Sequence, residues 1–189
     1  MKKQATTILE LNHEEALNFL MDTQQFCSFE LPEYFDFQKV LNFVRTTIAE
    51  KPYDDCLSDK RPDDFCDTNM NILMNKYGRY GIRPITLPNP YLYYFMAREL
   101  CEKTNWMRIK DCFSHFSVPH IKACALPVLP EEKEPFNKAT VILNWWNQME
   151  QRSLELSLEY KYMFVTDITN CYGSVNPQTI EALRAPVKP

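Results

Sequence analysis

The fold is decided by the stretch MNILMNKYGRYGIRPITLPNPYLYYFMARELC, residues 70–101. Two short β-prone runs flank KYGRYG (76–81), a loop whose two glycines suit the positive backbone angles of a tight turn. The pattern predicts a β-hairpin with basic residues at and beyond its tip, namely Lys76, Arg79 and Arg83. After Pro90 the apolar residues follow helical spacing, so a helix is expected over 91–101.

Helices are also expected on both sides of this stretch. Residues 13–22 carry an amphipathic pattern in which Asn12 is the predicted N-cap and Glu15 completes a capping box. Residues 36–50 place apolar side chains at helical spacing, and residues 138–160 form the longest such pattern in the chain. The prediction is an α+β fold with N-terminal helices and small antiparallel strands.

Three other stretches give less regular patterns. Residues 52–69 contain six aspartates and predict an exposed acidic loop. Residues 112–130 alternate loosely and carry three prolines, so short strands and turns are expected there. The run YKYMFVTD (160–167) is apolar, β-prone and ends in a carboxylate, so we expect a buried strand with Asp167 at its exit. A carboxylate held in this way either suits a hard cation such as Mg²⁺ or caps a helix or turn.

Composition excludes several classes of protein. The length of 189 residues allows one domain, or a small domain with an appendage. Only three glycines are present, which excludes a Walker A loop and a dinucleotide-binding fingerprint. No apolar stretch approaches about 18 residues, and no apolar region follows Lys2 and Lys3, so neither a membrane span nor a signal peptide is expected. The seven cysteines include no C-x-x-C pair, which fits a reducing cytoplasm.

Charge is distributed unevenly along the chain. The net charge is −4, yet residues 70–128 hold 8 Lys and Arg against 3 Asp and Glu, between acidic flanks. Such a segment is either an ordinary solvated face or a patch that binds phosphate groups.

A zinc site is the competing interpretation of part of this segment. The cysteines and histidines of CFSHFSVPHIKAC follow a C-x₂-H-x₄-H-x₃-C spacing, formed by Cys112, His115, His120 and Cys124. The order of the ligands is unusual for a zinc knuckle and the last gap is short, so no structural zinc is expected. Phe113, Phe116, Val118 and Ile121 interleave instead like a strand that packs on a core.

Three segments, in family order, resemble the reverse transcriptases. YMFVTDITNCYGSVNP (162–177) resembles motif A of the palm, and RYGIRPITLPNPYLYY (79–94) resembles the fingers hairpin. HEEALNFLMDTQQFCSFELPEYFDF (13–37) is similar to the start of bacterial abortive-infection and defence-associated reverse transcriptases. The resemblance divides the chain into an N-terminal helical region with an acidic loop (1–69), a fingers-like hairpin with strands (70–137), and a long helix with a partial palm (138–189).

The resemblance implies roles for individual residues. Asp167 matches the motif A carboxylate that holds both Mg²⁺ ions of a two-metal phosphoryl transfer, and the backbone carbonyl of Ile168 would line the same site. Tyr172 matches the aromatic residue that lies under the sugar and excludes a 2′-hydroxyl. The basic residues that neutralise the incoming triphosphate correspond to Arg83, with Lys76 and Arg79 beside it.

The implied function is that of an RNA-directed DNA polymerase in bacterial antiviral defence. It would be cytoplasmic and would use Mg²⁺, deoxynucleoside triphosphates, an RNA template, and a DNA or protein primer. The family also needs a second pair of aspartates, whereas residues 168–189 contain Glu181 as their sole acid. We therefore expect a truncated chain that does not polymerise alone. The alternative is a non-catalytic nucleic-acid-binding or interaction module derived from a reverse transcriptase.

Overall fold

The computed structural model describes residues 6–27, 34, 36–57, 69–75, 81–121, 124, 126–129 and 138–166. These residues form an α+β structure with a two-stranded antiparallel sheet, as predicted. The elements are η1 (Ile8–Glu10), α1 (His13–Leu20), α2 (Thr23–Phe26), α3 (Phe37–Ile48), α4 (Tyr53–Leu57), β1 (Met70–Asn75), β2 (Ile82–Leu87), α5 (Pro90–Leu100), α6 (Lys103–His115) and α7 (Lys138–Ser157). Contacts divide the chain into two units, residues 1–149 and residues 150–189. No helix among the described residues is long and apolar enough to cross a membrane.

Helix α1 begins with the predicted capping box. The Asn12 side chain accepts hydrogen bonds from the backbone N–H groups of Glu14 and Glu15, at 3.0 and 2.9 Å. The Glu15 carboxylate in turn accepts from the Asn12 N–H at 2.9 Å. Two of the N–H groups that a helix start leaves unpaired are satisfied by one side chain, which fixes where α1 begins.

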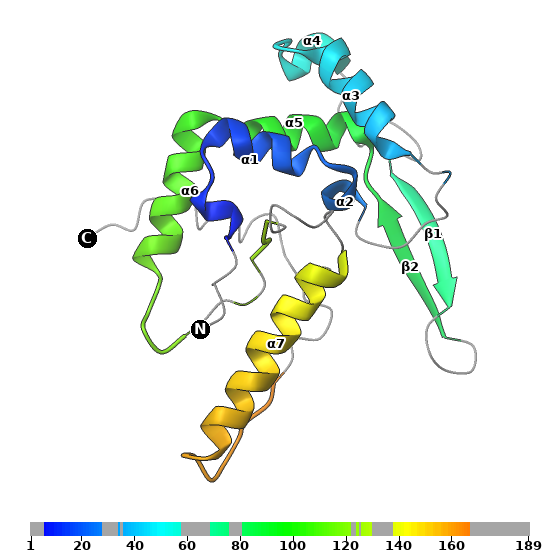
Figure 1. The fold of residues 1–189 in the computed structure, drawn as a ribbon. Helices are drawn as coiled ribbons and strands as arrows, with labels where there is room; N and C mark the ends of the chain where they lie inside the picture. The colour runs from blue at the N-terminus through cyan, green and yellow to red at the C-terminus, as the bar shows by residue number, and fades with distance from the viewer. Residues whose placement is uncertain are drawn as a thin grey trace. The chain divides into compact units, whose positions relative to one another are not determined.

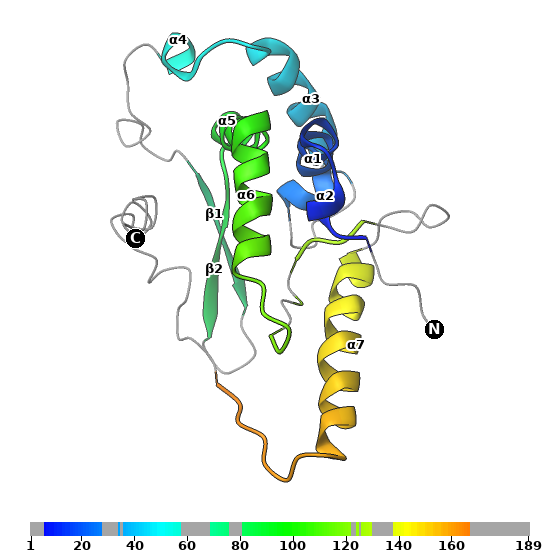
Figure 2. The ribbon, with the colours of Figure 1, turned by 90° about the vertical axis from the view of Figure 1, so that its left-hand side faces the viewer.

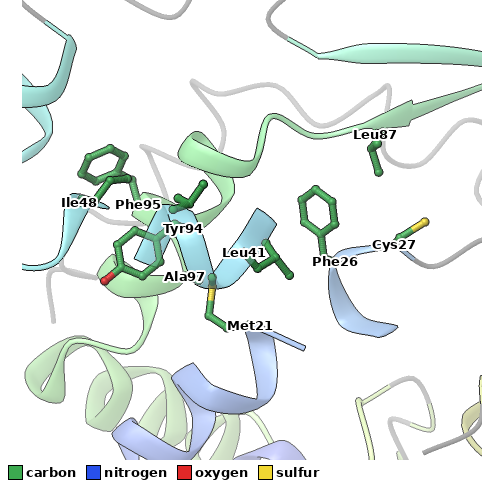
Figure 3. Packing of buried hydrophobic residues seen from close by; sticks show 10 residues of the cluster. Met21, Phe26, Cys27, Leu41, Ile48, Leu87, Tyr94, Phe95 and Ala97 are labelled. Atoms are coloured by element: carbon green, nitrogen blue, oxygen red, sulfur yellow. The ribbon is translucent and has the colours of Figure 1, made fainter. Parts of the chain in front are cut away.

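The main core lies between α3 and α5, which pack side by side (Figures 1 and 2). From α3 the buried residues are Leu41, Val44 and Ile48, at i, i+3 and i+7, which confirms the helical spacing predicted for 36–50. Helix α5 contributes Tyr94, Phe95 and Ala97, and the segment around α2 contributes Met21, Phe26 and Cys27 (Figure 3). Leu87, at the end of β2, belongs to the same cluster, so the core holds the base of the hairpin.

A second, smaller cluster holds the N-terminal segment against α6. Trp106 of α6 is buried with Ile8 and Ala16, and its indole N–H donates to the Leu11 carbonyl at 3.1 Å. Beside it, Thr7 forms an antiparallel bridge with Val128. The backbone of the first described residues is therefore paired with a segment that follows α6.

Helix α3 ends in a strained turn. Ala49 has φ 47° and ψ −118°, and the Lys51 N–H donates to the Ile48 carbonyl at 2.9 Å. These angles are those of the first central position of a type II′ turn, a position that favours glycine. Arg98 of α5 stabilises this turn by donating to the carbonyls of Ala49 and Lys51, at 3.0 and 2.8 Å.

Three sequence predictions are wrong. Residues 103–115 form helix α6, where strands and turns were expected from residue 112. The side chains expected to pack on a core from a strand are exposed instead: Phe113, Phe116, Val118 and Ile121. The start of the acidic segment forms the short helix α4, although Asp54 and Asp55 are exposed as predicted. Residues 160–166 form no strand, and their apolar side chains are exposed, Phe164 by 90%. A β-prone run becomes a strand only when its backbone pairs with another, and this run pairs with no strand of the described part.

Candidate nucleic-acid interface

The predicted hairpin is present. Strands β1 and β2 pair antiparallel in a register that runs from Met70 opposite Leu87 to Asn75 opposite Ile82. The Thr86 hydroxyl donates to the Asn71 side chain across the strands at 2.8 Å. The hairpin therefore has a fixed register on both strands, set by a cross-strand pair as well as by the backbone ladder.

The base of the hairpin is anchored to the helices. Leu87 is buried, and the Asn89 N–H donates to the Asn69 side chain at 2.9 Å. The Asn89 side chain then caps α5 by accepting from the Tyr91 N–H at 2.9 Å, and Pro90 occupies the first helical position. Figure 1 shows β2 leading directly into α5. The position of the hairpin relative to α5 is therefore set by hydrogen bonds at both sides of its base.

Both strands of the hairpin expose apolar side chains. Among its described residues, Met70, Leu73 and Ile82 are all more than half exposed. The sequence from residue 69 to residue 90 contains three cations and no acidic residue. The hairpin therefore carries no carboxylate that would repel an approaching phosphate group. Its three cations give the hairpin an electrostatic preference for anions. The run of 22 residues without an acid is a signal that could be seen in the sequence and that the prediction did not use.

The structure describes the backbone of only one predicted site residue. Arg83 lies in β2 at the position opposite Met74, which confirms its place on the return strand of the hairpin. Five other predicted site residues lie outside the described residues: Lys76, Arg79, Asp167, Ile168 and Tyr172. Their roles stay predictions.

No metal-binding cluster is found in the part of the chain that the structure describes. No three His, Cys, Asp or Glu side chains there lie close enough to hold a metal ion. Cys112 and His115 lie in the last turns of α6, and Cys112 is exposed. Asp167, which the resemblance places at a Mg²⁺ site, lies outside the described residues.

A hollow of about 300 Å³ lies between α3, α4 and α5. Its apolar wall is formed by Ile48, Leu92 and Phe95, and it also carries Lys51 and Asp55. The charges of Lys51 and Asp55 cancel, so the hollow has no preference for anions, unlike the hairpin. The hairpin is therefore the better candidate for a functional surface.

Comparisons with protein families and with curated proteins find no match. No family model matches the chain, and no curated protein matches it.

Proposed function

We propose that this chain is the fingers and the start of the palm of an RNA-directed DNA polymerase of the reverse-transcriptase type. In this proposal the hairpin β1–β2 contacts the phosphate groups of a nucleic-acid strand or an incoming deoxynucleoside triphosphate. The observation that carries it is the hairpin itself: it is antiparallel, has Arg83 on its return strand, and leads into α5 without an acidic residue.

The chemistry fits the residue types. Nucleotidyl transfer develops negative charge on phosphoryl oxygens, and a guanidinium group stabilises that charge by two parallel hydrogen bonds. Bound Mg²⁺ would supply Lewis-acid stabilisation of the same oxygens. Asp167 and the Ile168 carbonyl would hold the ion, and Tyr172 would select the deoxyribose sugar. These three assignments rest on the resemblance of residues 162–177 to motif A.

Strand binding tests the hairpin. The variant Lys76→Gln/Arg79→Gln/Arg83→Gln should bind a single-stranded oligonucleotide more weakly than the wild type. The slope of log K against log salt should fall by roughly 2, because each phosphate contact contributes about 0.7 on a single strand. The matched control is Lys39→Gln/Arg152→Gln/Lys161→Gln, which removes the same charge elsewhere. An equal loss in both variants would show that total charge, and not the hairpin, drives binding.

Nucleotide binding tests the polymerase. A deoxynucleoside triphosphate should bind in the presence of Mg²⁺, and both Asp167→Asn and Arg83→Gln should weaken that binding. Primer extension on an RNA template should show no incorporation above an Asp167→Ala control, because residues 168–189 lack the second aspartate pair. Robust extension that is abolished in the variant would show that another carboxylate of this chain completes the site.

A second function is favoured by one observation. Residues 160–166, which precede Asp167, form no strand and expose their apolar side chains. This favours a non-catalytic nucleic-acid-binding or interaction module that keeps the hairpin surface. Oligonucleotide binding through the hairpin, without any Mg²⁺-dependent nucleotide binding, would select this alternative.

A further inference from the structure

The apolar stripe of α6 continues beyond the core that covers its first half. Trp106 is 6% exposed, and Ile109 is packed against the same cluster. Phe113 and Phe116 continue the stripe, yet they are 46% and 74% exposed. Two large aromatic side chains therefore present their rings to solvent at the C-terminal end of this helix.

One cation, Arg108, lies on the same side of α6 as these aromatic rings. Arg108, His115 and Phe116 occupy positions i, i+7 and i+8, which places them on one side of the helix. The rings of His115 and Phe116 lie edge to face, with their centroids 4.9 Å apart. Arg108 forms no ion pair with any described residue. From residue 103 to residue 121 there are three Lys and Arg and a single acid, Asp111.

We propose that the C-terminal half of α6 binds single-stranded nucleic acid, with a base stacked on Phe116 and a phosphate group on Arg108. Exposed aromatic faces beside cations are the two elements that bind single strands without sequence preference. The Arg108 guanidinium, together with the net positive charge of α6, gives charge complementarity with a polyanion. Eight residues separate Arg108 from Phe116, or roughly 12 Å along the axis, so one short strand can reach both. The proposal does not rest on the hairpin.

Binding of a fluorescein-labelled oligo(dT) of about 15 nucleotides, a length within reach of such sites, tests the proposal on the 189-residue chain. Phe116→Ala should weaken binding about 10-fold, the loss expected for one stacked base. Phe116→Leu should weaken it equally, because leucine is apolar but has no aromatic face, and Phe116→Trp should retain binding. Arg108→Gln should lower the salt slope by roughly 0.7.

The control is Met107→Ala. Met107 is also about half exposed, and helical geometry places it on the opposite side of α6 from Phe116. This variant should bind as the wild type does, and its far-UV circular dichroism reports whether α6 tolerates a truncated side chain.

Several outcomes would overturn the proposal. Unchanged binding in Phe116→Ala, with a loss confined to the hairpin variant, would leave the hairpin function standing and refute the α6 surface. Full binding by Phe116→Leu would show that any apolar side chain suffices, against base stacking. A dimer that Phe116→Ala dissociates, with oligonucleotide binding unchanged, would identify a second copy of the chain as the occupant.

Discussion

Replacing Ala49 with glycine should stabilise the protein. The φ of 47° places the backbone of Ala49 in a sparsely populated region of φ/ψ space. Holding a residue other than glycine in this conformation costs about 1–3 kcal/mol. Glycine removes this strain but adds backbone entropy to the unfolded chain, which costs about 0.4–1 kcal/mol. The net gain in the free energy of unfolding is therefore about 1 kcal/mol. The free energy of unfolding of a small protein falls by about 2 kcal/mol per molar urea, so the urea midpoint should rise by about 0.5 M.

The assay is urea unfolding followed by circular dichroism, with Ala97→Gly as the matched control. Ala97 is fully buried inside α5, where glycine only weakens a helix, so this variant should be less stable by about 1 kcal/mol. The same substitution thus has opposite signs at two positions. Ala49→Val should also destabilise, because a β-branched side chain fits poorly at positive φ. A loss of stability in Ala49→Gly would refute the reasoning from strain.

Three further predictions concern titratable groups. Burial, together with the negative charges of Cys101 and Asp22, raises the pKa of Tyr93 to about 12. The neutral Tyr93 hydroxyl group therefore contributes stability that is fully present below about pH 10 and is lost as the pH rises toward about 12. Tyr93→Phe should flatten that alkaline loss in urea titrations, and an equally steep loss would contradict this origin. Hydrogen bonds from Thr104 and Asn105 lower the pKa of Glu102, so α6 should lose helicity as the pH falls through the carboxyl range, and Glu102→Gln should remove this dependence in circular dichroism. Burial raises the pKa of the Cys101 thiol to about 11, so site-resolved alkylation should modify exposed Cys112 more than about 100-fold faster, and comparable rates would show that Cys101 is accessible.

The parts of the fold that could be predicted are those with local causes. The capping box of Asn12 and Glu15 involves residues three apart, and the glycine-containing KYGRYG lies between two strands whose antiparallel pairing the structure shows. Such signals do not depend on the rest of the chain. The placement of Arg83 on a return strand follows from the same local pattern, and the structure confirms it.

The parts that could not be predicted depend on distant partners. Helix α6 is stabilised by burial of Trp106, whose indole bonds to Leu11, 95 residues earlier in the chain. The sequence pattern did not reveal the C-terminal end of this helix because residues 111–115 are all exposed, so no core packs against them. Residues 160–166 have strand propensity but no described strand to pair with. In such cases the packing environment, and not the intrinsic propensity, decides the secondary structure.

The bridge between Thr7 and Val128 has a consequence for the order in which the protein folds. The two bridged residues lie 121 positions apart in the chain. Next to the bridge, the Leu129 N–H donates to the Thr6 carbonyl at 2.8 Å. During synthesis at about 5–20 residues per second, the N-terminal segment waits roughly 6 to 24 s before its backbone partner is made. Closing so long a loop costs conformational entropy before the contact contributes any stabilisation. Helices α1, α3 and α5 can assemble during this interval, whereas the N-terminal segment can be fixed in place only late, as one of the final steps of folding.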